Sequence, residues 1–202
     1  MSKHSKKGRE KGKGVSTGEK IAGIVILILA VWGAYSFSQP PQPTPTTTIP
    51  TTSHNVATAP DFTLPVVSGK GLTGQKVSLS SFRGRVVFLE FMEPWCPHCQ
   101  SAVPALERLY EQFGPQNVVF LVISGPSEAT ADDTAKFIVN YHSSLIYVYD
   151  SSGTTFAAYG VQTFPVFLLI DKNGVVATSY TLSQGDVLPV QTIAADITRL
   201  NS

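Results

Sequence analysis

Short apolar runs alternate with amphipathic stretches over the C-terminal two thirds of the chain. Continuous runs of Val, Ile, Leu and Phe, typical of buried strands, occupy residues 85–91, 118–124, 145–149 and 166–170. Apolar residues recur at helical spacing in 97–113, 128–141 and 187–200, and a short helix is expected at 154–159. A short edge strand is expected at 76–79, and a strand at 175–180 is expected to be joined to 166–170 by a hairpin turn. This alternation predicts an α/β domain with a central mixed β-sheet flanked by helices.

The N-terminal part of the chain follows a different pattern. Residues 21–37 carry no charge and are mostly Ile, Leu, Val, Ala and Gly, so a transmembrane anchor is predicted at 21–38. Residues 1–38 hold seven Lys or Arg against two acidic residues, which makes 1–20 a basic tail. Basic residues before the anchor predict a cytoplasmic N-terminus and an extracytoplasmic domain on a single-pass protein of the cell membrane. The alternative is a cleaved signal peptide, because Ala34-Tyr35-Ser36 has the small-x-small form.

Residues 39–58 are rich in Pro and Thr, a composition that favours extended chain over a packed core, so they are predicted to be a linker. The remaining residues, 59–202, form the predicted globular domain. The chain after residue 38 holds eight basic and twelve acidic residues, so the basic excess belongs to the tail and not to the domain. Because an apolar segment directly follows the tail, nucleic-acid binding is not expected.

Only two cysteines occur in the chain, Cys96 and Cys99, where the strand at 85–91 gives way to the helix at 97–113. Cys96 falls at the helix start, and Pro97 occupies a first-turn position where proline is tolerated. A thiolate there faces unpaired N–H groups and the positive end of the helix dipole, which stabilise the reactive form. Cys99 lies one turn further on, close enough to attack a mixed disulfide on Cys96. We expect a redox pair with Cys96 as the exposed nucleophile and Cys99 as the buried resolving thiol.

Two other roles for the cysteine pair have less support. A structural disulfide over so short a loop removes little entropy from the unfolded chain. A structural zinc site needs about four ligands, and the chain has no second cysteine pair. His98, His142 and His54 are not spaced as additional ligands. Neither a metal nor a cofactor is therefore predicted.

The stretch Trp95-Cys96-Pro97-His98-Cys99 resembles the redox motif of the thioredoxin superfamily, and residues 59–202 resemble its membrane-anchored, extracytoplasmic TlpA/ResA-like branch. Pro104 stands where thioredoxins kink this helix, and Glu90 stands where they carry a buried Asp or Glu. Residues 59–64 and 77–84 look like that branch's lead-in segments. The resemblance implies a thioredoxin-like fold and thiol-disulfide oxidoreductase activity. The dipeptide Pro97-His98, in contrast, is the one found in DsbA-type oxidases.

The same resemblance implies a substrate-contact surface. Residues 160–166 align with the thioredoxin segment whose proline, here Pro165, is cis and packs beside the two cysteines. The backbone before that proline pairs with substrate chains like an added strand. Substrate contacts are therefore expected from Trp95, Pro97, Phe164 and Pro165, with Trp95 also shielding the disulfide.

Glu90 lies in an otherwise apolar strand, where burial is expected to raise the pKa of its carboxyl. Such a group can take the proton from Cys99 when that thiol must attack. Thioredoxins often pair this acid with a lysine on the next strand, but the corresponding position here is Phe120, which supplies no charge.

Three further polar residues receive different predictions. His98, between the cysteines, is expected to stabilise the Cys96 thiolate as a protonated or hydrogen-bonding imidazole. Glu93, in the turn between strand and helix, is expected to be solvated. His142 and His54 are expected on the surface.

Taken as a whole, the pattern predicts a membrane-tethered, extracytoplasmic thiol-disulfide oxidoreductase that donates disulfides to thiol-containing proteins through Cys96 and Cys99. A membrane or soluble redox partner is expected to complete its cycle. The alternative is a TlpA/ResA-type reductant that acts on a dedicated partner, such as a cytochrome c apoprotein.

Two other functional classes fit the motif less well. Peroxiredoxins carry Thr or Ser three residues before their reactive cysteine, where this chain has Glu93. Copper-delivery proteins of the Sco kind separate their two cysteines by three residues, whereas here two residues intervene.

Overall fold

The structure is a computed structural model that describes residues 58–182 and 186–202. The predicted tail, the anchor at 21–38 and all but the last residue of the predicted linker lie outside the described residues. In the part that is described, every helix is too short or too polar to cross a membrane.

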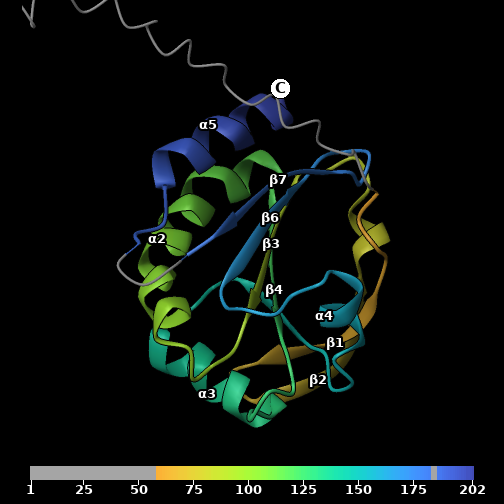
Figure 1. Cartoon of the computed structure of the whole chain (residues 1–202), viewed down its shortest axis with the longest axis vertical. Helices are drawn as coiled ribbons and strands as arrows, with labels where there is room; N and C mark the ends of the chain where they lie inside the picture. The colour runs from red at the N-terminus through yellow and green to blue at the C-terminus, as the bar shows by residue number, and fades with distance from the viewer. Residues whose placement is uncertain (1–57, 183–185) are drawn as a thin grey trace, which may run out of the picture. The chain divides into compact units, whose positions relative to one another are not determined.

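The described residues form an α/β fold around a seven-stranded sheet (Figure 1). The strands follow the order β2-β1-β5-β4-β3-β6-β7 across the sheet. Their bounds are β1 Thr63–Ser68, β2 Gly71–Ser78, β3 Val87–Met92, β4 Val119–Ser124, β5 Ile146–Tyr149, β6 Val166–Ile170 and β7 Val176–Thr181. Strand β3 pairs in parallel with β4, and β4 with β5, whereas β6, β7, β1 and β2 join by antiparallel pairing. The predicted mixed central sheet is therefore confirmed.

In residues 58–182 and 186–202, four α-helices and two short 3-10 helices accompany the sheet (Figure 1). Their bounds are η1 Leu79–Phe82, α2 Pro97–Phe113, η2 Gly114–Gln116, α3 Ala131–Tyr141, α4 Thr154–Ala158 and α5 Val190–Asn201. Helices α2, α3 and α5 pack on one face, where their buried residues form a single cluster with Phe88, Phe120 and Phe167. Helix α4 and η1 pack on the other face, against a second cluster that includes Leu89, Leu121 and Leu168.

The central strands are buried on both faces. All six residues of β3 and all six of β4 are buried, as expected for parallel strands covered by helices on both sides. Each fully buried Leu, Phe or Ile contributes roughly 1.5–3 kcal/mol relative to an exposed one. The cysteine-bearing turn therefore follows directly from the most deeply packed part of the domain.

Most of the predicted elements are present, with four main differences. The edge strand predicted at 76–79 is the end of a longer strand, β2, which begins at Gly71. Strand β1 was not predicted, and it lies between β2 and β5 as the only link from the β1–β2 hairpin to the rest of the sheet. Helix α3 begins at Ala131, later than the predicted 128, because Thr130 caps it in a reciprocal pair with Asp133. Helix α5 begins at Val190 instead of 187.

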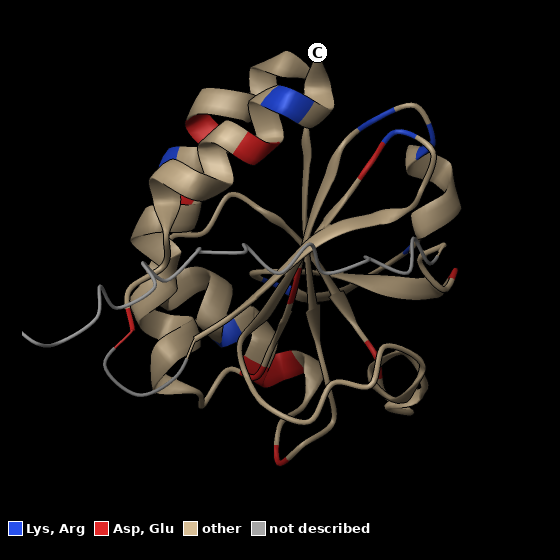
Figure 2. Cartoon of the chain, turned by 45° about the horizontal axis from the view of Figure 1, so that its top comes forward, with Lys and Arg blue, Asp and Glu red and all other residues tan. Residues whose placement is uncertain are grey.

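The charged residues of the described chain lie mostly on the helices and on loops at the ends of the strands, with both signs on α3 and α5 (Figure 2). Two ion pairs, Lys136–Asp133 and Arg199–Asp196, each join residues three apart on one helix. Exposed pairs of this kind contribute little to stability. The charges that matter for chemistry are instead the few buried carboxyl groups described next.

Candidate redox site

Cys96 is the N-cap residue of α2, and Pro97 is the first residue of the helix, as the sequence predicts. The backbone of Cys96 is extended, and its Sγ accepts a hydrogen bond from the Cys99 N–H at 3.3 Å. The first N–H groups of a helix have no partner within the helix, so a thiolate at the cap satisfies one of them. The helix is seventeen residues long and contains Pro104 in its interior.

The two thiols are not linked in this structure and have opposite acid–base properties. A hydrogen bond from the Cys99 thiol is the main reason that the pKa of Cys96 is lowered to about 6. Burial opposes this shift, whereas the backbone N–H groups of Cys99 and His98 and the charge of His98 add to it. Burial, the hydrogen bond to Cys96 and the charge of Glu90 raise the pKa of Cys99 far above its ordinary value. At neutral pH the pair therefore holds one proton, on Cys99, and Cys96 is a thiolate.

The prediction that Cys96 is exposed is wrong. Its exposed fraction is 4%, against 1% for Cys99. Pro97, the next residue, is exposed, whereas Cys96 belongs to the buried cluster that α2 forms with the sheet. Hydrogen bonding, more than exposure, distinguishes the two cysteines.

Glu90 is buried in the middle of β3, as predicted. Burial, followed by the negative charge of Cys96, raises the pKa of its carboxyl to about 8. Its neighbours in register are Val122 on β4 and Phe167 on β6, so neither adjacent strand supplies a charge there. Phe120, the position expected to correspond to the thioredoxin lysine, lies opposite Phe88. Oε1 of Glu90 has no hydrogen-bond partner in the described part of the chain.

The prediction that Glu93 is solvated is wrong. Its side chain is completely buried, not solvated. Oε1 accepts a hydrogen bond from the Ser127 N–H at 3.2 Å, in the loop between β4 and α3. Burial raises the pKa of the Glu93 carboxyl to about 7, and the charge of Cys96 adds to this rise. Hydrogen bonds from the backbone N–H groups of Ser127 and Gly125 oppose it. A Cβ atom added to Gly125 would lie 2.8 Å from Oε1, so a residue without a side chain makes room for the carboxyl.

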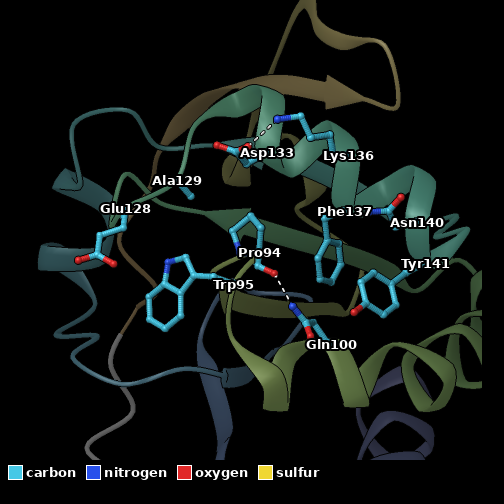
Figure 3. A pocket seen from close by; sticks show the side chains of 10 residues that line it. All are labelled: Pro94, Trp95, Gln100, Glu128, Ala129, Asp133, Lys136, Phe137, Asn140 and Tyr141. Atoms are coloured by element: carbon cyan, nitrogen blue, oxygen red, sulfur yellow. Dashed lines mark hydrogen bonds and ion pairs between the residues drawn. The ribbon is translucent and has the colours of Figure 1, made fainter.

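Trp95 covers one side of the cysteine turn while remaining 48% exposed. Its indole N–H donates to the Ser127 carbonyl at 2.6 Å, and its ring meets the Phe164 ring edge-on at 6.0 Å. Trp95 also forms part of a pocket of about 410 Å³ between the start of α2 and α3, whose wall includes the Phe137 and Tyr141 rings (Figure 3). The pocket places an aromatic, partly polar surface beside Pro94 and Trp95, the two residues that precede Cys96.

The peptide bond between Phe164 and Pro165 is cis, as the resemblance implied. Pro165 is buried, and β6 begins at the next residue. Phe164 packs between the rings of Trp95 and Phe156, so the segment before β6 is joined to the cysteine turn through aromatic contacts.

Of the three histidines considered above, His98 lies at the site. His98 lies in the first turn of α2, partly exposed, where its charge acts on Cys96. His142 is exposed at the C-terminus of α3, and His54 lies outside the described residues. Among residues 58–182 and 186–202, no three His, Cys, Asp or Glu side chains come together in a way that could hold a metal ion.

Comparison with known proteins relates this domain to redox proteins. The chain is 30% identical over 118 residues to the thioredoxin-like protein YneN of Bacillus subtilis, covering 58% of this chain and 66% of that protein. It is 34% identical over 121 residues to the thiol-disulfide oxidoreductase ResA of Geobacillus thermodenitrificans, covering 59% and 65%. The matched stretch thus spans slightly less than two thirds of these relatives.

Solved structures give the same fold. A chain from Chlorobium tepidum described as a thiol:disulfide interchange protein, DsbE, has a TM-score of 0.63 and 26% identity, covering 73% of this chain and 97% of that one. A secreted disulfide oxidoreductase of Mycobacterium tuberculosis has a TM-score of 0.56 and 22% identity, covering 69% and 96%. The model of the AhpC/TSA family matches residues 56–179, which is more than half of the chain. The chain is therefore a member of the AhpC/TSA family with a thioredoxin-like fold.

Proposed function

We propose that the protein is a thiol-disulfide oxidoreductase that exchanges disulfides with protein substrates through Cys96 and Cys99. The observation that carries the proposal is the N-cap position of Cys96, whose Sγ accepts the Cys99 N–H at 3.3 Å. That arrangement, with a pKa of about 6 for Cys96, makes one sulfur a nucleophile and good leaving group at neutral pH. The redox names of the relatives support the same activity.

In the oxidising direction, a substrate thiolate attacks Sγ of Cys96 in the Cys96–Cys99 disulfide. The bond between the two cysteines breaks, and Cys99 leaves with the electron pair and takes up a proton. A second substrate thiolate then attacks the substrate sulfur of the mixed disulfide, and Cys96 leaves as a thiolate. Two electrons pass from the substrate dithiol to the cysteine pair, and the substrate gains a disulfide.

Glu90 is proposed to supply and remove the proton of Cys99. The carboxyl is buried beneath the cysteines, and its negative charge is among the causes that raise the pKa of Cys99. With a pKa of about 8, Glu90 is mostly protonated at neutral pH and can donate when Cys99 leaves. In the reducing direction the ionised fraction takes the proton from Cys99 before it attacks the mixed disulfide.

The substrate is proposed to lie across Trp95, Pro97, Phe164 and Pro165. Trp95 and Phe164 are in contact, Pro97 is exposed beside Cys96, and the backbone before β6 is placed to pair with an extended chain. Protein substrates that present a thiol or disulfide in an extended segment therefore fit this surface.

The direction we propose is disulfide donation. A couple whose reduced form is stabilised by an acidic thiol is more oxidising, by about 30 mV for each pKa unit. The pKa of about 6 for Cys96 lies below the value of about 7 for thioredoxin and above that of about 3.5 for DsbA. It is closer to thioredoxin, so the site supports a milder oxidant than the Pro97-His98 dipeptide alone predicts.

The second candidate is a reductant for a dedicated partner such as a cytochrome c apoprotein. It is favoured by the match to ResA and by the thioredoxin-like acidity of Cys96. Both candidates use the same two sulfurs and differ only in the potential of the pair.

The location we propose is the outer side of the cell membrane, with residues 21–38 as the anchor, 1–20 in the cytoplasm and 39–58 as the spacer. The uncharged apolar run with basic residues before it supports this topology.

The test is the equilibrium reduction potential of the pair in defined thiol–disulfide buffers. Disulfide donation predicts a value above thioredoxin's, which is about −270 mV, and below DsbA's, which is about −120 mV. A value at or below that of thioredoxin would assign the protein to the reductant role. Failure of the cysteines to exchange with any thiol would remove the oxidoreductase proposal itself.

A further inference from the structure

Glu93 occupies a position between the two cysteines and the β4–α3 loop. Its carbonyl accepts the Cys96 N–H at 3.0 Å, and its backbone hydrogen-bonds to Cys99. Its carboxyl is completely buried, with Oε1 held by the Ser127 N–H. Oε2 is also buried and has no hydrogen-bond partner among the described residues. A buried, half-satisfied carboxyl costs free energy, and nothing in the exchange mechanism above uses it.

We propose that Glu93 is a positioning residue that takes up a proton when the Cys96–Cys99 disulfide is reduced, which allows Cys96 to remain a thiolate. The inference rests on the proposed thiol-disulfide exchange. In the disulfide, Cys96 is neutral and the Glu93 carboxylate stands alone. After reduction, a thiolate and a carboxylate would face each other in a buried turn, where like charges repel strongly.

The protons and electrons balance as follows. The disulfide with ionised Glu93 takes up two electrons and two protons. The products are a Cys99 thiol, a Cys96 thiolate and a Glu93 carboxylic acid. Without the Glu93 carboxyl, the second proton would bind to Cys96 at a pH below the pKa of that thiol. At a higher pH only one proton would be taken up on reduction.

The surroundings explain why Glu93 fits this role better than Glu90. The backbone N–H groups of Ser127 and Gly125 oppose the burial of Glu93, so the pKa of its carboxyl is raised only to about 7. Glu90, raised to about 8 mainly by burial, keeps its proton near neutrality. The pKa of Cys96, about 6, lies below both values, so the thiolate forms while Glu93 is still protonated.

The elements around Glu93 carry few other titratable groups. His98 lies in the first turn of α2, and Tyr149 on β5 has its pKa raised by burial and then by the charge of Glu93. On the β4–α3 side, Glu128 is exposed in the loop and Asp133 is paired with Lys136 on α3. From α4 the contact is the uncharged ring of Phe156, which packs against Gly125. Of Cys96, Glu90 and Glu93, the residue whose pKa lies nearest to neutrality is Glu93.

The test is the pH dependence, from pH 6 to 8.5, of the half-reaction that reduces the full-length protein. It is obtained from the equilibrium with glutathione after the two protons that glutathione itself takes up per disulfide are accounted for. Each proton that the protein takes up per disulfide changes the equilibrium constant of this half-reaction tenfold per pH unit, which is about 30 mV. Between pH 6 and 7 the wild-type protein is expected to change about hundredfold, because nearly two protons are taken up. Glu93→Gln is expected to change by little more than tenfold over the same interval. Glu111→Gln, an exposed carboxyl on α2, is the charge-matched control and should keep the wild-type slope.

A wild-type slope in Glu93→Gln would overturn the inference while leaving the proposed function intact. Where that variant fails to fold, infrared difference spectra of the wild-type and Glu90→Gln proteins at pH 6.5 provide the second measurement. A protonated carboxyl band that appears on reduction in both proteins supports the inference, and its absence overturns it. A wild-type protein that does not equilibrate with glutathione would instead overturn the proposed oxidoreductase function.

Discussion

Cys96 at the N-cap of α2 and Cys99 in its first turn lie in environments that shift the pKa values of their thiols in opposite directions. Cys96 and Cys99 are three residues apart and are both almost fully buried. Yet the pKa of Cys96 falls to about 6, whereas that of Cys99 rises far above its ordinary value. Burial raises the pKa of both thiols and is the largest cause of the rise at Cys99, but it cannot explain the fall at Cys96.

The fall at Cys96 comes from hydrogen-bond donors and a nearby positive charge, whereas at Cys99 a hydrogen bond and a negative charge add to the effect of burial. Cys96 receives the Cys99 thiol, two backbone N–H groups and the charge of His98. Cys99 gives its proton to that hydrogen bond and faces the carboxyl of Glu90. The hydrogen-bond donors at the start of α2 therefore make Cys96 the nucleophile. Burial and the nearby carboxyl of Glu90 keep Cys99 protonated.

The largest effect that this comparison predicts is an all-or-none difference between the two cysteine variants. Cys99→Ser should accumulate mixed disulfides with substrate, because the nucleophile remains and the resolving thiol is gone. Cys96→Ser should form none, because the remaining thiol keeps its proton. Non-reducing gels and mass spectrometry of trapped complexes measure this. Trapping by Cys96→Ser and not by Cys99→Ser would reverse the roles.

The next largest effect concerns the buried base. Glu90→Gln should slow resolution of a mixed disulfide by about 10²-fold at pH 7, which is typical for loss of a general acid–base group. The attack of Cys96 on a small disulfide should stay close to the wild-type rate. In the wild-type protein the resolution rate should rise with pH up to about 8, as Glu90 loses its proton. Stopped-flow kinetics of both steps provides the data, with Glu111→Gln as the matched control. Equal slowing of the two steps would point to a structural defect.

A smaller effect is expected on stability. The pKa values of Glu90 and Glu93 are raised in the folded protein, to about 8 and about 7, above their unfolded values. The folded state therefore binds more protons at these two groups. The stability that they contribute is fully present below about pH 4.3 and is lost as the pH rises through 7 and 8. The lowered pKa of Cys96 opposes part of this loss as the pH rises above 6, but the two carboxyl shifts together are larger. The melting temperature of the reduced protein should therefore fall between pH 5 and pH 8.5, and that of Glu90→Gln should fall less steeply. A melting temperature that rises over this range would contradict the burial of both groups as acids.

The smallest effect should come from His98. Its charge is the last of the causes that lower the pKa of Cys96, after the Cys99 thiol and the backbone N–H groups. His98→Ala should therefore raise the pKa of Cys96 and lower the reduction potential, but only slightly. The pH profile of Cys96 alkylation measures the shift, and His142→Ala on the exposed end of α3 is the control. A loss of most of the acidity on removal of His98 would show that the imidazole, not the helix start, activates Cys96.

Local sequence was sufficient for the parts of the site that depend on nearby residues. The position of Cys96 at the start of α2, the burial of Glu90 in an apolar strand and the cis bond before Pro165 are all as expected. Each follows from a short pattern: a proline after the cysteine, one acid in an apolar run, or the resemblance to a known motif. The domain boundaries and the roles assigned to these side chains stay predictions.

What the sequence did not show depends on distant segments. Glu93 is buried because Ser127 and Gly125, more than thirty residues away, fold over its carboxyl. Strand β1 contains Pro65 and a register shift, and it pairs with β5, some eighty residues later, so no regular alternation marked it. The low exposure of Cys96 likewise depends on the tertiary packing around the turn, which a local pattern does not contain.

The acidity of Cys96 is the property on which the exchange chemistry and the proton uptake by Glu93 both depend. Thiolate absorbance of the reduced protein across pH 4 to 10, with alkylation mapped to each cysteine by mass spectrometry, measures it directly. We predict one transition near pH 6, assigned to Cys96, while Cys99 stays unreactive until well above pH 9. A first transition near pH 8.5, the value of an unperturbed cysteine, or one that belongs to Cys99, would contradict the account.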